Sequence, residues 1–296
     1  MKQNKITSKY LFVTILNIVI TLAEFLGGIL SGSLALLSDA VHNLSDVAAI
    51  VISFVAHLIG QKDRDKHKTF GYQRAETLAA FTNGVVLFVI SFFLMIEAFE
   101  RFSKPQEVKG KLMLIIAVIG LMANGISMLV MKRDSSHNLN VRSTFLHMLS
   151  DALSSVAVVI GAVIIYFWKS NLVDPLMTLL VSIFVMSEAY KITKKAANIL
   201  MESNPNVDLD EVKKIVLSFP EVTNLHHLHV WRYSDDLIMM DAHVNVTEKM
   251  SVVQLEQLYM KIGQVLKEKL GINHVTLQAE CQRGLKENMI VLNKDD

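Results

Sequence analysis

"HNLSDVAAIVISF" (residues 42–54) and "HMLSDALSSVAVVI" (residues 147–160) share a motif in which a histidine precedes an aspartate by four positions. Each motif leads into a long apolar run. An ionisable side chain at the centre of a membrane helix costs about 2.5–3.5 kcal/mol on insertion scales, so it normally faces a protein interior or a water-filled cavity. The repeated motif therefore predicts two membrane helices that share a polar interior.

The composition favours a membrane protein. Of the 296 residues, 52% are hydrophobic and 19% are charged, and the mean hydropathy is +0.39. This balance is too apolar for an ordinary soluble domain. The 29 basic and 28 acidic residues nearly cancel, so the charge gives no indication of a nucleic-acid partner. A single cysteine, Cys281, excludes a disulfide framework within the chain and a cysteine-cluster metal site.

Six apolar segments approach the roughly 20 residues that a helix needs to cross the hydrocarbon core. The first is too long for a signal-peptide core and lacks a cleavage pattern, so we expect it to be a span. Asp174 and Pro175 predict the start of the last one, with Asp174 as its cap. The six segments are Tyr10–Leu30, Leu34–Gly60, Leu78–Phe102, Leu112–Met131, Phe145–Trp168 and Leu172–Ile192.

Lysine and arginine flank these segments unevenly. Residues 2–9, 61–74, 132–142 and 191–195 are basic and fall on one side of a six-span arrangement. On the other side only residues 101–111 are basic. Because basic segments stay in the cytoplasm, both termini are expected there.

Beyond residue 200 the sequence resembles that of a soluble domain. Its apolar spacing predicts the order helix, strand, strand, helix, strand, which is typical of a small α+β sandwich with its helices on one face of the sheet. We therefore expect a transmembrane domain in residues 1–200 and a cytoplasmic domain in residues 201–296. The five predicted elements lie in residues 208–219, 222–233, 237–246, 251–270 and 272–280.

The two motifs predict one metal site. Residues four apart lie on the same face of a helix, so His42 with Asp46 and His147 with Asp151 form two matched pairs. Two imidazoles and two carboxylates suit Zn²⁺, and this ligand set also accepts Co²⁺, Ni²⁺ or Mn²⁺. The alternative is that each pair only forms hydrogen bonds between helices.

Other polar residues occur in the spans. Asp39 lies three residues before His42, where it could support the metal site or receive an incoming ion, or simply cap the helix. The remaining ones are expected to form hydrogen bonds between helices rather than to bind metal. They are Asn17, Glu24, Asn83 and Asn124.

Four segments resemble the cation diffusion facilitator family, in particular its zinc, cadmium and cobalt exporters. They are "LLSDAVHNLSD" (36–46), "HKTFGYQRAE" (67–76), "FLHMLSDALSSVAVV" (145–159) and "LHHLHVW" (225–231). The resemblance implies a homodimeric divalent-cation/proton antiporter with six spans and a metal-sensing, ferredoxin-like cytoplasmic domain. It places the transport site on His42, Asp46, His147 and Asp151, and it associates the first histidine with preference for zinc over cadmium.

The cytoplasmic domain offers further ligands. Alternation in residues 237–246 and 274–280 places His243 on one polar strand face and Glu280 on another, the latter together with His274 and Gln278. In residues 222–233 periodicity cannot choose between His226 on one face and the two histidines 227 and 229 on the other. The resemblance favours His226 with His243 and Glu280, and His274 and Gln278 as helpers. The alternative is a solvated, histidine-rich face.

The segment "DRDKHKTFGYQRAE" (63–76) resembles a loop that carries an additional metal site in some relatives. Asp65 and His67 remain candidate ligands, but Tyr72 stands where that pattern has a histidine. The alternative is a solvated basic loop near lipid headgroups.

These observations predict a transporter in a bacterial plasma membrane rather than an enzyme. Its expected partners are divalent metal ions, protons, lipid and a second copy of the chain, with Zn²⁺ as substrate and regulatory ligand. Because metals bind deprotonated ligands, loading of the site would release protons. The competing hypotheses are a membrane metalloenzyme, in which zinc activates water, and a passive channel.

Overall fold

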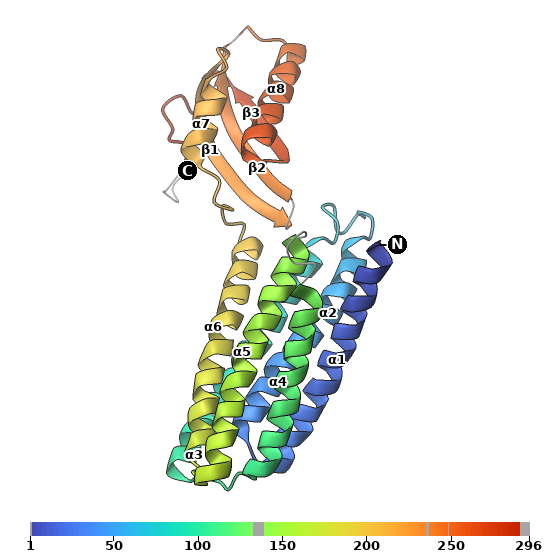
Figure 1. The fold of residues 1–296 in the computed structure, drawn as a ribbon. Helices are drawn as coiled ribbons and strands as arrows, with labels where there is room; N and C mark the ends of the chain where they lie inside the picture. Colours follow the sequence, from blue (N-terminus) through green and yellow to red (C-terminus); the bar gives the residue numbers. More distant parts are fainter. Residues whose placement is uncertain (1, 133–138, 235–236, 248, 291–296) are drawn as a thin grey trace. The chain divides into compact units, whose positions relative to one another are not determined.

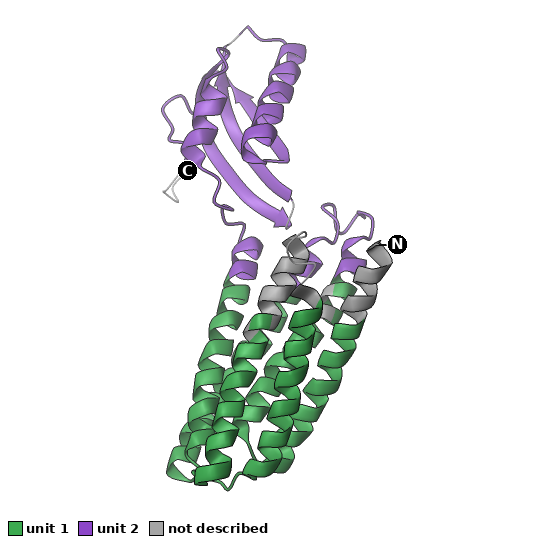
Figure 2. Cartoon of the chain, in the orientation of Figure 1, with its two compact units in different colours: residues 1–56, 79–194 green, residues 57–78, 195–296 purple. Residues whose placement is uncertain are grey.

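The computed structural model describes residues 2–132, 139–234, 237–247 and 249–290, without the side chains of residues 2–11, 50, 53, 131–132, 139–148 and 150. The chain divides into two compact units (Figure 2). Unit 1 comprises Met1–Ala56 and Ala79–Lys194, and unit 2 comprises His57–Leu78 and Lys195–Asp296.

Six long helices form the membrane part of the fold (Figure 1). Among the described residues, these are the helices long and apolar enough to cross a membrane, and each corresponds to one predicted span. The helices are α1 (Lys2–Ser31), α2 (Leu34–Gly60), α3 (Arg74–Ser103), α4 (Gly110–Lys132), α5 (Leu139–Trp168) and α6 (Val173–Leu200). α1, α3, α5 and α6 extend beyond the predicted spans because backbone hydrogen bonding continues where the apolar run ends.

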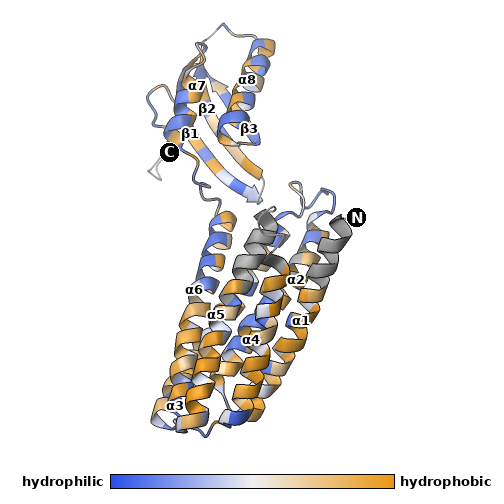
Figure 3. Ribbon diagram, viewed as in Figure 1, coloured by the Kyte–Doolittle hydropathy of each residue, from blue (hydrophilic) through white to orange (hydrophobic). Residues whose placement is uncertain are grey.

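Apolar side chains of unit 1 lie both inside and outside the bundle. Leu36, Met113 and Val158 are almost completely buried in its core. In contrast, Phe93 and Phe167 are 64% and 68% exposed. The hydropathy colouring shows hydrophobic residues along all six helices (Figure 3). Such an apolar outer surface fits a lipid environment, because lipid tails are as apolar as these side chains.

The start of α2 is capped by a residue of α6. Oδ1 of Asp174 accepts a hydrogen bond from the Ser33 hydroxyl at 2.5 Å, and Oδ2 accepts one from the Leu34 N–H at 2.8 Å. Arg101 lies 3.8 Å from the same carboxylate, which is completely buried. The prediction that Asp174 caps its own helix is wrong. α6 begins at Val173, and the carboxylate of Asp174 instead accepts from the first N–H groups of α2, which have no acceptor within their own helix.

The predicted order of the cytoplasmic elements is confirmed. The elements are α7 (Leu209–Leu217), β1 (Val222–Ser234), β2 (Leu237–Val246), α8 (Val252–Leu270) and β3 (His274–Glu280). The described strands form one sheet in the order β1-β2-β3, in which β1 and β2 are antiparallel and β2 and β3 are parallel. The fold is therefore a membrane helix bundle followed by an α+β domain.

This domain has its own hydrophobic core. α7 and α8 contact each other and cover the apolar face of the sheet, where Leu225, Met240 and Val244 meet Ile262 and Leu266. All five side chains are fully buried. The alternation predicted for β2 is confirmed, and it leaves the opposite face to the polar residues.

Candidate metal centres

Helices α2 and α5 bring Asp151 of the second motif next to His42 of the first motif inside unit 1. The Nε2 atom of His42 lies 3.3 Å from Oδ1 of Asp151 and 3.8 Å from Oδ2 of Asp46. His42 and Asp151 are 5% and 4% exposed, so both are removed from lipid and from bulk solvent. The i, i+4 spacing explains the contact of His42 with Asp46, and the packing of α2 against α5 explains its contact with Asp151.

The geometry of this group suits a divalent cation. One candidate ligand atom from each of His42, Asp46 and Asp151 lies within 4.8 Å of the other two. In a tetrahedral zinc site with bonds of roughly 2.0–2.2 Å, neighbouring ligand atoms are about 3.3–3.6 Å apart. The side chain of His147, the fourth predicted member, lies outside the described residues, so its participation stays a prediction.

Asp39 is held by α5 rather than by the start of its own helix. It is 2% exposed and accepts hydrogen bonds from the hydroxyls of Ser154 at 2.9 Å and Ser155 at 3.1 Å. The interpretation of Asp39 as a helix cap is therefore wrong, because α2 begins five residues earlier, at Leu34. Asp39 instead links α2 to the helix that carries Asp151.

The predicted hydrogen bonds between helices are present. They connect α1 to α2, α2 to α3, α4 to α5 and α1 to α4. The pairs are Asn43 Nδ2 to Glu24 Oε2 (2.8 Å), Asn83 Nδ2 to Ser45 Oγ (3.2 Å), Asn124 Nδ2 to Ser155 Oγ (2.9 Å) and Ser127 Oγ to Asn17 Oδ1 (3.5 Å). Buried amides and hydroxyls thus find partners that lipid cannot provide.

The loop between α2 and α3 engages both oxygens of Asp65. Oδ1 accepts from the N–H groups of His67 (2.7 Å) and Lys68 (2.8 Å), and Oδ2 accepts from the Tyr72 hydroxyl at 2.6 Å. The Tyr72 bond, followed by the two backbone bonds, lowers the pKa of Asp65. The carboxylate therefore has a local structural role, which favours the solvated loop over a metal site.

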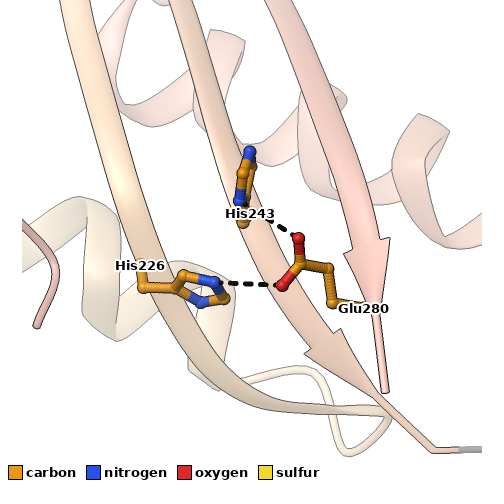
Figure 4. Close-up of side chains that lie close together, drawn as sticks. All are labelled: His226, His243 and Glu280. Carbon is orange, nitrogen blue, oxygen red and sulfur yellow. Dashed lines mark ion pairs between the residues drawn. The ribbon is translucent and has the colours of Figure 1, made fainter. Parts of the chain in front are cut away.

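A second cluster lies on the polar face of the cytoplasmic sheet. In Figure 4, His226 from β1 and His243 from β2 both point to the carboxylate of Glu280 at the end of β3. His226 Nε2 is 3.3 Å from Oε2 of Glu280, and His243 Nδ1 is 3.3 Å from Oε1. The structure thus brings together all three residues that the resemblance favours.

An irregularity in β1 selects His226 among the three histidines. His226 pairs with His243 and His229 pairs with Asp241, so β1 has one more residue than β2 in this interval. The extra residue is a β-bulge, and His227 has a positive φ of 49°. The bulge interrupts the alternation that simple periodicity assumes. It leaves His226 buried on the polar face and His227 and His229 exposed.

The surroundings of His243 and Glu280 favour the unprotonated forms of these two side chains. Burial lowers the pKa of His243, and the neighbouring His227, His226 and Arg283 lower it further, against the effect of Glu280. For Glu280, burial acts to raise the pKa, but the hydrogen bond from Gln278 and the nearby His243, Arg283 and His226 lower it overall. A neutral imidazole and an ionised carboxylate are the forms that bind metals.

The two residues predicted to assist this cluster, Gln278 and His274, lie at different distances from it. Gln278 donates a hydrogen bond to Oε1 of Glu280 at 2.8 Å and so orients this carboxylate. His274 pairs with Met239 at the opposite end of β3, about 20 Å along the strand from Glu280. The helper role of His274 is therefore wrong.

One nearby carboxylate was missed by sequence reasoning. Oε2 of Glu287 lies 3.7 Å from Nε2 of His226. Glu287 follows β3 in a segment without helical or strand periodicity, so no spacing rule connects it to the cluster. Only the return of the chain toward β1 brings it there.

The comparisons with known proteins cover almost the whole chain. The family model described as the cation efflux transmembrane domain matches residues 10–201. The chain belongs to the cation diffusion facilitator family. A second model, the cation efflux protein cytoplasmic domain, matches residues 204–282 of this facilitator.

Curated relatives of the facilitator agree with this assignment. It is 38% identical over 271 residues to the cadmium, cobalt and zinc/H(+)-K(+) antiporter of Bacillus subtilis, covering 90% of this chain and 87% of that protein. It is 39% identical over 264 residues to the zinc transporter ZitB of Escherichia coli, with coverages of 88% and 83%. The metal cation efflux system protein CzcD of Cupriavidus metallidurans is 37% identical over 260 residues, with coverages of 88% and 82%. The facilitator is thus a multi-pass membrane protein of cation efflux.

Proposed function

We propose that this facilitator exports Zn²⁺, and Co²⁺ or Cd²⁺ less well, from the cytoplasm in exchange for protons. The observation that carries the proposal is the group formed by the buried His42 and Asp151 with the partly buried Asp46, between α2 and α5. Imidazole and carboxylate ligands suit zinc and its neighbours in the first transition series. The relatives named for zinc, or for cadmium, cobalt and zinc, support this substrate class.

His147 completes the transport site in this proposal. It lies four residues before Asp151 on α5, as His42 lies four residues before Asp46 on α2. The resulting set of two histidines and two aspartates gives zinc four ligands, whose two negative charges balance the charge of the ion. A neutral complex lowers the free-energy cost of placing the cation inside the bundle.

Proton exchange follows from competition for the same lone pairs. Each ligand binds either a proton or the metal, so loading zinc on one side of the membrane expels protons, and protonation on the other side expels zinc. When the site opens alternately to the two sides, an inward proton gradient drives metal outward. The antiporter named for H⁺ and K⁺ supports ion exchange as the driving reaction.

The cytoplasmic residues have a regulatory role in this proposal. Residues 1–200 form the transport domain, and residues 201–296 sense metal and join two copies of the chain. Metal bound by His226, His243 and Glu280 would stabilise one arrangement of the dimer when cytosolic metal is high. We place both termini in the cytoplasm, in a bacterial plasma membrane, on the basis of the basic flanks and the bacterial relatives.

Zinc flux into proteoliposomes tests the proposal. With an acidic lumen, zinc is expected to accumulate inside against its own gradient, and a protonophore should abolish this accumulation. A potassium gradient, imposed alone and then together with the pH gradient, identifies the exchanged cation. Flux that is insensitive both to the pH gradient and to His147→Ala would contradict the proposal, and purely downhill flux would indicate a channel.

A further inference from the structure

The carboxylate of Glu287 faces the cytoplasmic cluster from outside the sheet. Its Oε2 lies 3.7 Å from Nε2 of His226, the same nitrogen that faces Glu280. The side chain of Glu287 is 50% exposed, whereas that of His226 is 1% exposed. Glu287 therefore stands at the solvent side of the cluster, next to a nitrogen suited to bind metal.

The chain before Glu287 is fastened to the two strands that carry the histidines. The side-chain amide of Asn245 in β2 donates to the carbonyl of Arg283 at 2.6 Å, and that of Asn224 in β1 donates to the carbonyl of Gly284 at 3.0 Å. Asn245 is completely buried, so its hydrogen bond is protected from water. These two bonds fix the start of the turn.

The chain after Glu287 is fastened as well. The N–H of Leu228 in β1 donates to the carbonyl of Met289 at 2.9 Å, and the Met289 side chain packs against the hydrophobic core. Leu228 lies two residues after His226, inside the bulged part of β1. Glu287 is thus held between two anchored points of the backbone.

Gly284 permits this close approach. Its φ is +65°, and a Cβ atom at this position would overlap the His226 ring. Any other residue would both strain the backbone and displace the turn from the imidazole. The N–H of Glu287 donates to the carbonyl of Gly284 at 3.1 Å, which closes the turn over His226.

We propose that Glu287 is the fourth ligand of the cytoplasmic metal site, and that the segment 283–289 closes over a bound divalent cation. The inference rests on the proposed metal binding by His226, His243 and Glu280. Two imidazoles and two carboxylates then complete a four-coordinate shell typical of closed zinc sites. Glu287 lies beyond residues 204–282, which the family model of the cytoplasmic domain matches.

A surface ion pair is the simpler explanation of the contact. Such pairs contribute little when one partner is half exposed. Here, however, hydrogen bonds on both sides of Glu287 and a glycine that accepts no side chain hold the backbone of the turn beside His226. Three ligand atoms already lie within 4.8 Å of one another, and the half-exposed side chain of Glu287 borders this group at His226 Nε2.

Zinc affinity of the full-length protein in detergent tests the inference. Asp46→Asn with Asp151→Asn serves as the background, which removes the transport site, and a chromophoric chelator competes for the metal. Glu287→Gln is expected to weaken zinc binding by about 10- to 100-fold. Glu287→Asp keeps the charge but shortens the reach, so it should weaken binding similarly, while Glu256→Gln, an exposed carboxylate on α8, should leave binding unchanged.

Proteolysis gives a second readout. Trypsin cleaves after Arg283 and Lys286, which are exposed, and zinc should slow both cleavages in the background protein but not in Glu287→Gln. If Glu287→Gln or Glu287→Asp binds zinc as tightly as Glu256→Gln, and zinc still protects the segment, the role of Glu287 is refuted while the proposed site stands. If His243→Ala also leaves zinc affinity unchanged, the cytoplasmic site itself is refuted.

Discussion

The Nε2 atom of His42 in α2 lies 3.3 Å from Oδ1 of Asp151 in α5, although 109 residues separate them in the chain. Both side chains are buried in a bundle whose outer surface is apolar. The relationship means that neither helix can change its depth or rotation without altering the candidate transport site.

Replacing Asp151 by asparagine should stop transport without a change of shape. The amide keeps the size of the side chain but lacks the charge that a metal ligand supplies, so we expect zinc flux in proteoliposomes to fall by at least about 100-fold. The matched control is Asp210→Asn on the exposed surface of α7, which should transport normally. Residual flux above a tenth of the unmodified level would argue against Asp151 as a ligand.

Asp39 should affect transport through its connection to α5. Ser154→Ala combined with Ser155→Ala removes both hydroxyls that bind its carboxylate, and we expect about a tenfold lower apparent zinc affinity. Ser127→Ala removes another buried hydroxyl, one that faces Asn17, and serves as the control. Equal zinc KM values for the two proteins would show that Asp39 does not support the site.

The pKa of His243 can be measured in residues 201–296, which contain a complete hydrophobic core. Because this pKa is lowered in the folded domain, the NMR titration midpoint should lie below the ordinary value of about 6.5. The unfolded chain then binds the proton more readily. The contribution of His243 to stability is therefore complete above about pH 6.5 and decreases as the pH falls toward the folded pKa. A titration midpoint above about 6.5 would contradict the lowered pKa of His243 and the expected loss of its stability contribution at low pH.

The loop residue His67 should be dispensable. The structure uses the N–H of His67, not its ring, to bind Asp65, so His67→Ala is expected to change zinc flux by less than about twofold. Tyr72→Phe should raise the pKa of Asp65 toward its ordinary value, because the strongest hydrogen bond to the carboxylate is lost. A tenfold loss of flux in His67→Ala would instead indicate a metal site in the loop.

Substitutions at two positions on α8 should differ strongly in their effect on the free energy of unfolding of the cytoplasmic domain. Ile262 is fully buried, and Ile262→Ala should lower the free energy of unfolding by about 2–5 kcal/mol. Met260 is 69% exposed, and Met260→Ala should change it by less than about 0.5 kcal/mol. Urea denaturation of residues 201–296 measures both values. Similar values would contradict the placement of α8 against the sheet.

Much of this architecture could be predicted from the sequence because it depends on local patterns. Length and hydropathy locate six spans, and the spacing of apolar residues locates the five cytoplasmic elements. The four-residue spacing of His42 and Asp46 likewise predicts a shared helix face.

What the sequence could not predict depends on contacts between distant segments. The bulge at His227 breaks the period of two on which strand assignment relies. The hydrogen bonds of Asp39 to α5 and the position of Glu287 beside His226 arise from packing and from an irregular turn. No pattern within a single segment encodes these relationships.

The carboxylate of Asp174 has a consequence for biosynthesis. The N–H of Leu34 receives its partner from a residue 140 positions later in the chain. While the ribosome is still translating the region before α6, the first turn of α2 lacks this acceptor. The start of α2 therefore gains this cap only after Asp174, at the beginning of the sixth span, has been synthesised.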